Sequence, residues 1–441
     1  MVKLLILLSM LYYKPDTLTS IQDVVEYYKP KRGYTGIILL DRQGNEVFSY
    51  NADTYFTPAS LNKTLISSAF LYFLGPSYTF KTPILRDPVS GNLYFLASGD
   101  PSFKVKDLFE IFSFVKSAGI TSFDTLYLVD WAYDSVIYGA GWQLNDVTKG
   151  YMPPISSFIL ENNVVKITAL NRTGLYGKIV MCPQTKFVKA YRRNGNNYKI
   201  YDAIRGDTVI VVFEGNTGKE VLTTRSILVP EKFFQEQVDS VVKALSIRVK
   251  SICILKDLPI LKFDTLYVYD SKPAYVLLLD FMKYSLNIYG EAFLKTLGRE
   301  VYGGKGTYEK GLAAVDSLLR VVGLCDHFKP ADGSGLSRYN LATPRGIGEL
   351  LYFNYRDFRR FPEFASLLPI SGIDGTLSSN YKNLEGVFRG KTGTLTGVST
   401  VGGYIRSKSG EDYIYVIMLN NTTGSPKYFM EKILEFVYEH M

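Results

Sequence analysis

The chain has 441 residues, of which 46% are hydrophobic and 21% charged, and its formal net charge is +8. This length and composition predict an ordered globular protein of two or three domains. Only two histidines are present, which disfavours a Ser-His-Asp hydrolase and a zinc enzyme with histidine ligands. Lysines and arginines are scattered rather than clustered, so we expect no nucleic-acid partner, and we expect no metal or other cofactor.

The N-terminus contains a short apolar block, residues 4–13, directly after Lys3. The block is too short to span a bilayer and has the character of a signal-peptide core. We therefore expect residues 1–20 to be an N-terminal export segment. The alternative is an N-terminal helix that packs on the core.

Residues 34–50 are predicted to form a β-hairpin, with strands at 34–40 and 46–50 and a turn between them. Pro58 suits the first turn of a helix, and the apolar residues behind it are spaced for a largely buried helix that ends at Gly75-Pro76. Strands followed by such a helix indicate an α+β domain, in which helices pack on an antiparallel sheet.

The residue pattern changes at about Lys81, where a β-rich region begins. Glycine, asparagine and aspartate turns separate its short strand-like segments. The predicted strands are 92–97, 125–129, 164–168, 178–181 and 208–213, and the predicted helices are 107–118 and 230–245. We interpret residues 81–270 as a large insertion of one or two β-rich units.

The pattern turns helical after Pro273 and ends in strands and one more helix. The predicted helices are 274–284, 289–297, 307–322, 344–354 and 427–440, and the predicted strands are 387–391, 400–406 and 413–419. Strands from both chain ends are expected to join one sheet. Residues 21–80 and 271–441 would then form the two parts of one domain.

Ser60 and Lys63 stand at the start of the first predicted helix, three residues apart, so their side chains share a face. A serine hydroxyl becomes a good nucleophile when a base takes its proton, and a lysine with a lowered pKa can be that base. Free N–H groups at a helix N-terminus can stabilise the oxyanion of a tetrahedral intermediate. A Ser-x-x-Lys pair alone is most often an exposed helical pair without a role.

Two further motifs follow in order, Ser285-Leu286-Asn287 and Lys391-Thr392-Gly393. The ordered set Ser-x-x-Lys, Ser-x-Asn and Lys-Thr-Gly is typical of penicillin-binding proteins and serine β-lactamases. Each triplet can occur by chance. The occurrence of all three in this order indicates serine acyl-transfer chemistry.

The chain resembles the class C low-molecular-mass penicillin-binding proteins, the D-alanyl-D-alanine carboxypeptidase/endopeptidase family of the penicillin-binding protein 4 type. The resemblance covers nearly the whole chain and includes the segments 97–101, 141–142, 332–338 and 368–375. It implies a penicillin-binding, β-lactamase-like transpeptidase domain of class α+β, split by the insertion 81–270, with a third domain nested at roughly 164–230. It also implies a signal peptide and a periplasmic or cell-envelope location.

The resemblance assigns roles to the motif residues. Ser60 is expected to be the nucleophile and Lys63 the general base for acylation. Ser285 is expected to relay a proton to the leaving amine. Asn287 is expected to orient Lys63 and the substrate amide. Lys391 is expected to supply positive charge for a substrate that ends in a free carboxylate.

The resemblance also implies substrate-binding residues around the third motif. Thr392 is expected to bond the substrate carboxylate, and Gly393 to leave room for a strand-like peptide. The backbone N–H of Thr394 is expected to join that of the nucleophile in the oxyanion hole. Arg338 is expected to face the substrate, and Glu161 to meet the amine of the stem peptide's third residue.

The implied function is a serine DD-peptidase that cleaves D-Ala-D-Ala ends, and also D-Ala cross-links, of peptidoglycan through an acyl-enzyme. The implied partners are peptidoglycan stem peptides and, as covalent inhibitors, β-lactam antibiotics. Peripheral membrane association is compatible with the basic charge. Two alternatives stay open: a serine β-lactamase, which the large insertion fits poorly, and a catalytically silent cell-wall binding protein that kept the fold.

The three cysteines, Cys182, Cys253 and Cys325, have no metal-ligand spacing. One alternative is a Cys182–Cys253 bridge, and the other is three buried thiols.

Overall fold

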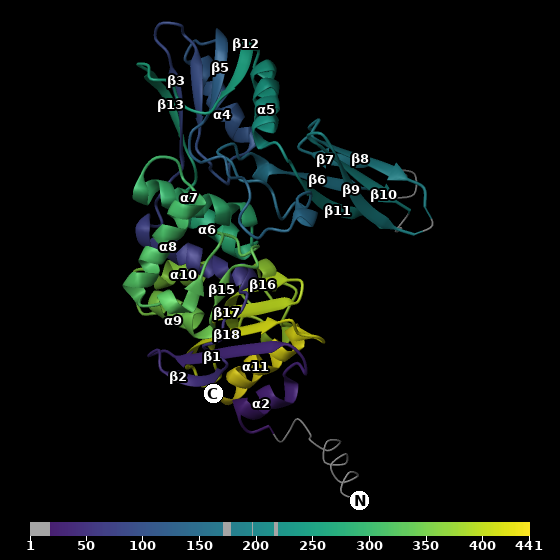
Figure 1. Ribbon diagram of the computed structural model, residues 1–441, viewed down its shortest axis with the longest axis vertical. Helices are drawn as coiled ribbons and strands as arrows, with labels where there is room; N and C mark the ends of the chain where they lie inside the picture. Colours follow the sequence, from purple (N-terminus) through teal and green to yellow (C-terminus); the bar gives the residue numbers. More distant parts are fainter. Residues whose placement is uncertain (1–17, 171–177, 196, 216–218) are drawn as a thin grey trace, which may run out of the picture. The chain divides into compact units, whose positions relative to one another are not determined.

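The structure is a computed structural model that describes residues 18–170, 178–195, 197–215 and 219–441. The apolar block predicted as a signal-peptide core lies outside the described residues. Among those that are described, no helix is both long and apolar enough to cross a membrane. The chain divides into two compact units, coloured along the sequence in Figure 1. The first unit is Met1–Thr64, Leu324–Lys329 and Asn340–Met441, and the second unit is Leu65–Gly323 and Pro330–Tyr339.

The first unit is built on a five-stranded antiparallel sheet with the strand order β16-β17-β18-β1-β2. Its strands are β1 (Tyr34–Asp41), β2 (Glu46–Tyr50), β16 (Phe388–Leu395), β17 (Val398–Arg406) and β18 (Asp412–Asn420). β1 pairs along its whole length with β18, so that Tyr34 lies opposite Asn420. The predicted hairpin and the predicted joining of both chain ends in one sheet are therefore confirmed.

Helices cover both faces of this sheet because its strands are apolar on both sides. The N-terminal α2 (Ile21–Tyr28) and C-terminal α11 (Pro426–His440) bury Val25 and Leu434 against one face, together with Ile37. On the other face lies α9 (Pro344–Tyr355), where Gly348 contacts Ile38. A shorter helix, α10 (Phe361–Leu367), follows α9. The sequence predicted α9 and α11 but missed α2, which begins with a capping box formed by Ser20 and Asp23.

The second unit contains a five-stranded mixed sheet with the order β12-β5-β4-β3-β13. Its strands are β3 (Lys81–Arg86), β4 (Leu93–Ala97), β5 (Ser122–Asp130), β12 (Arg248–Leu255) and β13 (Asp264–Asp270). Helices α4 (Val105–Ser117) and α5 (Pro230–Ala244) pack on it through Phe112 and Phe234. β3 and β13 pair in antiparallel fashion, so the region 81–270 starts and ends in neighbouring strands. This pairing supports the insertion, which we retain as a proposal.

Two small sheets lie between β5 and α5 along the chain (Figure 1). One has the order β11-β6-β7 and the other β8-β10-β9. Their strands are β6 (Val164–Ala169), β7 (Ile179–Cys182), β8 (Val188–Arg193), β9 (Lys199–Arg205), β10 (Thr208–Glu214) and β11 (Val221–Ser226). Because β6 pairs with β11, the segment that contains the two small sheets begins and ends in neighbouring strands. This supports the nested domain at 164–230, which stays a proposal.

Three helices complete the second unit: α6 (Ala274–Lys283), α7 (Asn287–Tyr302) and α8 (Tyr308–Val322). All three were predicted, although α7 is longer than the predicted 289–297. Both alternatives for the cysteines were wrong. The three thiols are free, Cys182 and Cys325 are exposed, and Cys253 is partly buried.

Candidate active site

Ser60 lies in a short 3₁₀ turn, Ala59–Asn62, that leads directly into helix α3 (Lys63–Phe73). The predicted helix therefore begins at Lys63 and not at Pro58. The cause is Ala59, whose φ of 50° is left-handed and interrupts a helical backbone. Such a conformation costs a non-glycine residue roughly 1–3 kcal/mol and persists only where surrounding contacts impose it. The strain lies directly before the predicted nucleophile.

Two polar side chains from the sheet impose this turn. Thr400 Oγ1 on β17 donates to Pro58 O at 2.8 Å. Asn420 at the end of β18 accepts the N–H of Thr57 at 2.8 Å and donates to Thr57 O at 3.2 Å. Neither Thr400 nor Asn420 was predicted from the sequence. Both are polar residues in otherwise apolar strands, and this is the sequence feature that could have singled them out. Both are buried, with Thr400 2% exposed and Asn420 9% exposed.

The Ser60 and Lys63 side chains meet as predicted. Lys63 Nζ lies 2.9 Å from Ser60 Oγ, and Lys63 is fully buried. An amine within hydrogen-bond distance of a hydroxyl has the geometry that proton transfer between them requires. This pair can therefore activate a serine nucleophile without a histidine.

Strand β16 lies against the nucleophile turn because it carries a glycine there. A Cβ on Gly393 would lie 2.6 Å from Pro58 O and 2.9 Å from Ser60 N, distances that no side chain tolerates. Lys391 on the same strand is fully buried, and its Nζ donates to Thr392 O at 2.6 Å. Burial, and then the nearby charge of Lys63, hold the pKa of Lys391 well below its usual value. The free site therefore holds the Lys391 proton weakly.

The outer edge of β16 can bind an extended peptide. Gly390 N–H donates to Pro369 O on the side away from β17. Successive N–H groups of a strand alternate in direction, so those of Thr392 and Thr394 point to the same edge. Thr392 Oγ1 lies 2.8 Å from Thr376 Oγ1, which orients the hydroxyl. The first unit thus brings together Ser60, Lys63, Lys391, Thr392, Gly393 and Thr394.

The other predicted site residues belong to the second unit. Ser285 has a φ of 57° and precedes α7, and Asn287 is the first residue of that helix. Asn287 Nδ2 donates to Tyr151 O at 2.7 Å. Arg338 is partly exposed at the end of the loop Pro330–Tyr339.

That loop is organised by its buried carboxylate, Asp332. The carboxylate accepts the N–H groups of Gly335 at 2.8 Å and Ser337 at 2.6 Å, and the indole N–H of Trp142 at 2.8 Å. The segments 141–142 and 332–338, both singled out in the sequence, therefore contact each other.

Glu161 has a local partner in the second unit. Its Oε1 accepts the N–H of Val105, the first residue of α4, at 3.1 Å. A carboxylate is stabilised at a helix N-terminus by the free N–H groups and the dipole. In this structure Glu161 therefore caps α4, and its contact with a substrate amine stays a prediction.

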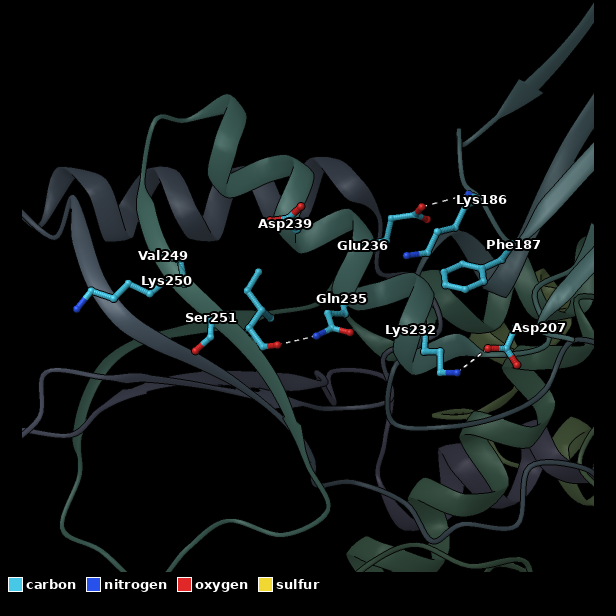
Figure 2. Close-up of a pocket in the computed structure, with 11 residues that line it drawn as sticks. Lys186, Phe187, Asp207, Lys232, Gln235, Glu236, Asp239, Val249, Lys250 and Ser251 are labelled. Atoms are coloured by element: carbon cyan, nitrogen blue, oxygen red, sulfur yellow. Dashed lines mark hydrogen bonds and ion pairs between the residues drawn. The ribbon is translucent and has the colours of Figure 1, made fainter.

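A pocket of about 570 Å³ in the second unit, shown in Figure 2, is lined by none of the motif residues. Most of its charged residues have partners, either in the pocket or beside it: Asp239 pairs with Lys243 and Lys250 with Asp124. Lys232 pairs with Asp207 at 2.5 Å, and Glu236 accepts the backbone N–H of Lys186 at 3.1 Å. We interpret this pocket as a solvated surface of mixed charge. Across the described ranges, no group of three or more His, Cys, Asp or Glu side chains could hold a metal ion.

Comparisons with known proteins agree with the motifs. The model of the "D-Ala-D-Ala carboxypeptidase 3 (S13) family" matches residues 20–437. A D-alanyl-D-alanine carboxypeptidase of Actinomadura sp. (strain R39) is 25% identical over 429 residues, which cover 89% of this chain and 78% of the relative. The D-alanyl-D-alanine carboxypeptidase DacB of Haemophilus influenzae is 25% identical over 423 residues, with 90% and 87% covered.

The fold of the chain also matches that of a solved structure. The crystal structure of penicillin-binding protein 4 (dacB) from Haemophilus influenzae superposes with a TM-score of 0.83 at 22% identity, and covers 96% of this chain and 99% of that one. The predicted α+β fold is therefore confirmed. Since the family model spans all three motifs, the chain belongs to the D-Ala-D-Ala carboxypeptidase 3 (S13) family.

Proposed function

We propose that this protein is a serine-type D-Ala-D-Ala carboxypeptidase that works through an acyl-enzyme on Ser60. The observation that carries the proposal is the 2.9 Å contact between Lys63 Nζ and Ser60 Oγ in a chain of this family. Lysine-based activation also suits a chain with only two histidines.

In the acylation step, Lys63 takes the Ser60 proton and Oγ attacks the carbonyl carbon of the penultimate D-Ala. The N–H groups of Ser60 and Thr394 stabilise the resulting oxyanion. The C–N bond then breaks, and the amine of the terminal D-Ala leaves with a proton that Ser285 relays. Asn287 orients Lys63 and the substrate amide. Water next attacks the ester carbonyl, gives up a proton and releases Ser60.

Recognition of the free carboxylate is proposed for Lys391 and Thr392. A carboxylate beside Lys391 favours its charged form, which burial and Lys63 disfavour in the free site. Each charge-assisted hydrogen bond contributes about 1.5–3 kcal/mol. Gly393, which has no side chain, is proposed to leave room for a strand-like peptide at this edge of β16. Arg338 and Glu161 are kept as proposed substrate contacts, to be tested separately.

Two similar solved structures support a wider function. A penicillin-binding protein 4 structure from Haemophilus influenzae, with a TM-score of 0.78, is complexed with a β-lactam. A similar structure, with a TM-score of 0.52, is a peptidoglycan endopeptidase of Bdellovibrio bacteriovorus. We propose that β-lactams acylate Ser60, that stem peptides of peptidoglycan are the substrate, and that D-Ala cross-links are cleaved at the same site. Action in the cell envelope, export by residues 1–20 and peripheral membrane association belong to the same proposal.

The test is covalent labelling of the purified protein by fluorescent penicillin, together with D-alanine release from a peptide that ends in D-Ala-D-Ala. The same peptide with a C-terminal amide and the Ser60→Ala variant are the controls. We expect labelling and release in the wild type only, and poor cleavage of the amide. No labelling and no release would support the silent cell-wall binding protein. Rapid multiple turnover of penicillin would assign the protein to the β-lactamases.

A further inference from the structure

The helix that carries Asn287 also carries a buried carboxyl group one turn further on, that of Glu291. Glu291 is fully buried. Its Oε1 accepts the N–H of Ser334 at 2.8 Å, and its Oε2 accepts the N–H of Gly333 at 3.1 Å. Residues four apart on a helix share a face, so Asn287 and Glu291 point to the same side of α7. The carboxyl group thus joins α7 to the loop that ends with Arg338.

Backbone contact brings the same two elements together. A Cβ on Gly290 would lie 2.6 Å from Gly333 O, and a Cβ on Gly333 would lie 2.0 Å from Gly290 O. No side chain fits between α7 and the loop at this point. The loop position is therefore set by close glycine contact and by the two hydrogen bonds to Glu291.

Titratable groups from the loop, from α8 and from α7 itself lie around Glu291. Asp332 of the loop brings a second negative charge, Tyr308 lies on α8, and Lys295 follows on α7. Lys295 Nζ is bonded to Asp134 Oδ1 at 2.5 Å and to Val136 O at 2.6 Å. Burial, and then the charge of Asp332, raise the pKa of Glu291 to about 7. The Ser334 hydroxyl and the two backbone donors act in the opposite direction, because they stabilise the ionised carboxylate.

We propose that Glu291 is a positioning residue for the peptidase reaction: its ionised carboxylate accepts both loop N–H groups and fixes Arg338 and its loop on the helix of Asn287. A protonated carboxyl group must turn its O–H away from both donors, so one of its oxygens becomes a poorer acceptor. The loop then loses a charge-assisted hydrogen bond and becomes less ordered. The inference rests on the proposed function, since it concerns the residues that would face the substrate.

The experiment compares Glu291→Gln with wild type across the pH range of activity. Glutamine has the same shape but offers one acceptor and does not ionise. The control is Glu300→Gln, on the same helix with a 36% exposed side chain. We expect the ratio of wild-type to Glu291→Gln kcat/KM for D-alanine release to rise about tenfold as pH increases through neutrality. The ratio for Glu300→Gln should stay flat.

Hydrogen–deuterium exchange of the peptide 332–338 gives a second readout that needs no activity. The amides of Gly333 and Ser334 should exchange faster in Glu291→Gln, while peptides of the β3–β4 hairpin stay unchanged. A wild type that releases no D-alanine would contradict the proposed function and leave this readout intact. A flat rate ratio, or unchanged exchange, would overturn the positioning role. If the glutamine variant does not fold, Glu291→Asp decides: it ionises but is one methylene shorter, and unchanged exchange there refutes the proposal.

Discussion

Replacement of Gly393 by alanine should disable the site while the fold survives. The added Cβ would lie 2.3 Å from Thr400 Oγ1, 2.6 Å from Pro58 O and 2.9 Å from Ser60 N. Two of these three atoms belong to backbone that the sheet already fixes through Thr400 and Asn420. β16 and the nucleophile turn must therefore separate by several tenths of an ångström.

The expected cost can be worked from that separation. Overpacking a tight interior typically costs about 1–3 kcal/mol of unfolding free energy. The larger effect should be on kcat, because the N–H groups of Ser60 and Thr394 move apart. Loss of one oxyanion donor lowers kcat by about 10²–10³-fold. We expect kcat for D-alanine release to fall by roughly this factor, with a smaller change in KM.

The assay is steady-state D-alanine release together with thermal unfolding. The matched control is Gly402→Ala on β17, where the nearest atoms to an added Cβ lie at 3.3 Å, so neighbours need to move only slightly. Activity of Gly393→Ala within about threefold of wild type would refute the reasoning, since it would show that the turn and β16 can separate without harm.

Three further predictions concern other parts of the chain. Ser60→Ala and Lys63→Ala should each abolish acylation by penicillin, and the double variant should be no worse than either, as measured by gel labelling. Lys391→Met should abolish D-alanine release yet raise the unfolding temperature. The reason is that Lys391 has a lowered pKa in the folded state, so its protonated form destabilises the fold. This destabilisation is largest at low pH and disappears as pH rises towards the usual lysine pKa. A lower unfolding temperature of Lys391→Met at neutral pH would contradict this. Asp202 has a lowered pKa, although burial opposes it, because Lys149, Thr148 and Arg225 bond its carboxylate. The ionised Asp202 therefore stabilises the fold at pH values above the usual aspartate pKa, and this stabilisation is lost as pH falls through the lowered pKa. Asp202→Asn should lower the free energy of unfolding by about 3 kcal/mol at neutral pH and by less in acid. Chemical denaturation at several pH values measures this difference.

Sequence reasoning succeeded where the apolar pattern is strong. The hairpin of β1 and β2 and the helices after Pro273 could be placed because their buried residues recur with a clear period. Six strands of the region 81–270 were missed: β3, β8, β9, β11, β12 and β13. Their residues are mostly partly or fully exposed, so the alternation of apolar and polar positions is weak.

The motifs predicted the reactive side chains, but the residues that position those side chains were not predicted. Thr400 and Asn420 act through the register of strands far along the chain, which local sequence does not contain. The left-handed φ of Ala59 is imposed by those same contacts. Glu291 and Lys295 are charged residues on a helix, a pattern that ordinarily indicates a solvated face, yet both are fully buried.

The pairing of β1 with β18 has a consequence for how the chain is made. Tyr34 lies opposite Asn420, so the catalytic sheet cannot close until nearly the whole chain has been synthesised. At about 5–20 residues per second, the first hairpin waits roughly 20–80 s for its partner. The sheet closed by β3 and β13 needs no residue beyond Asp270 and can form earlier. The nascent chain therefore leaves one edge of the apolar strand β1, the edge that later pairs with β18, unpaired for most of its synthesis. This edge is where a chaperone would protect the chain.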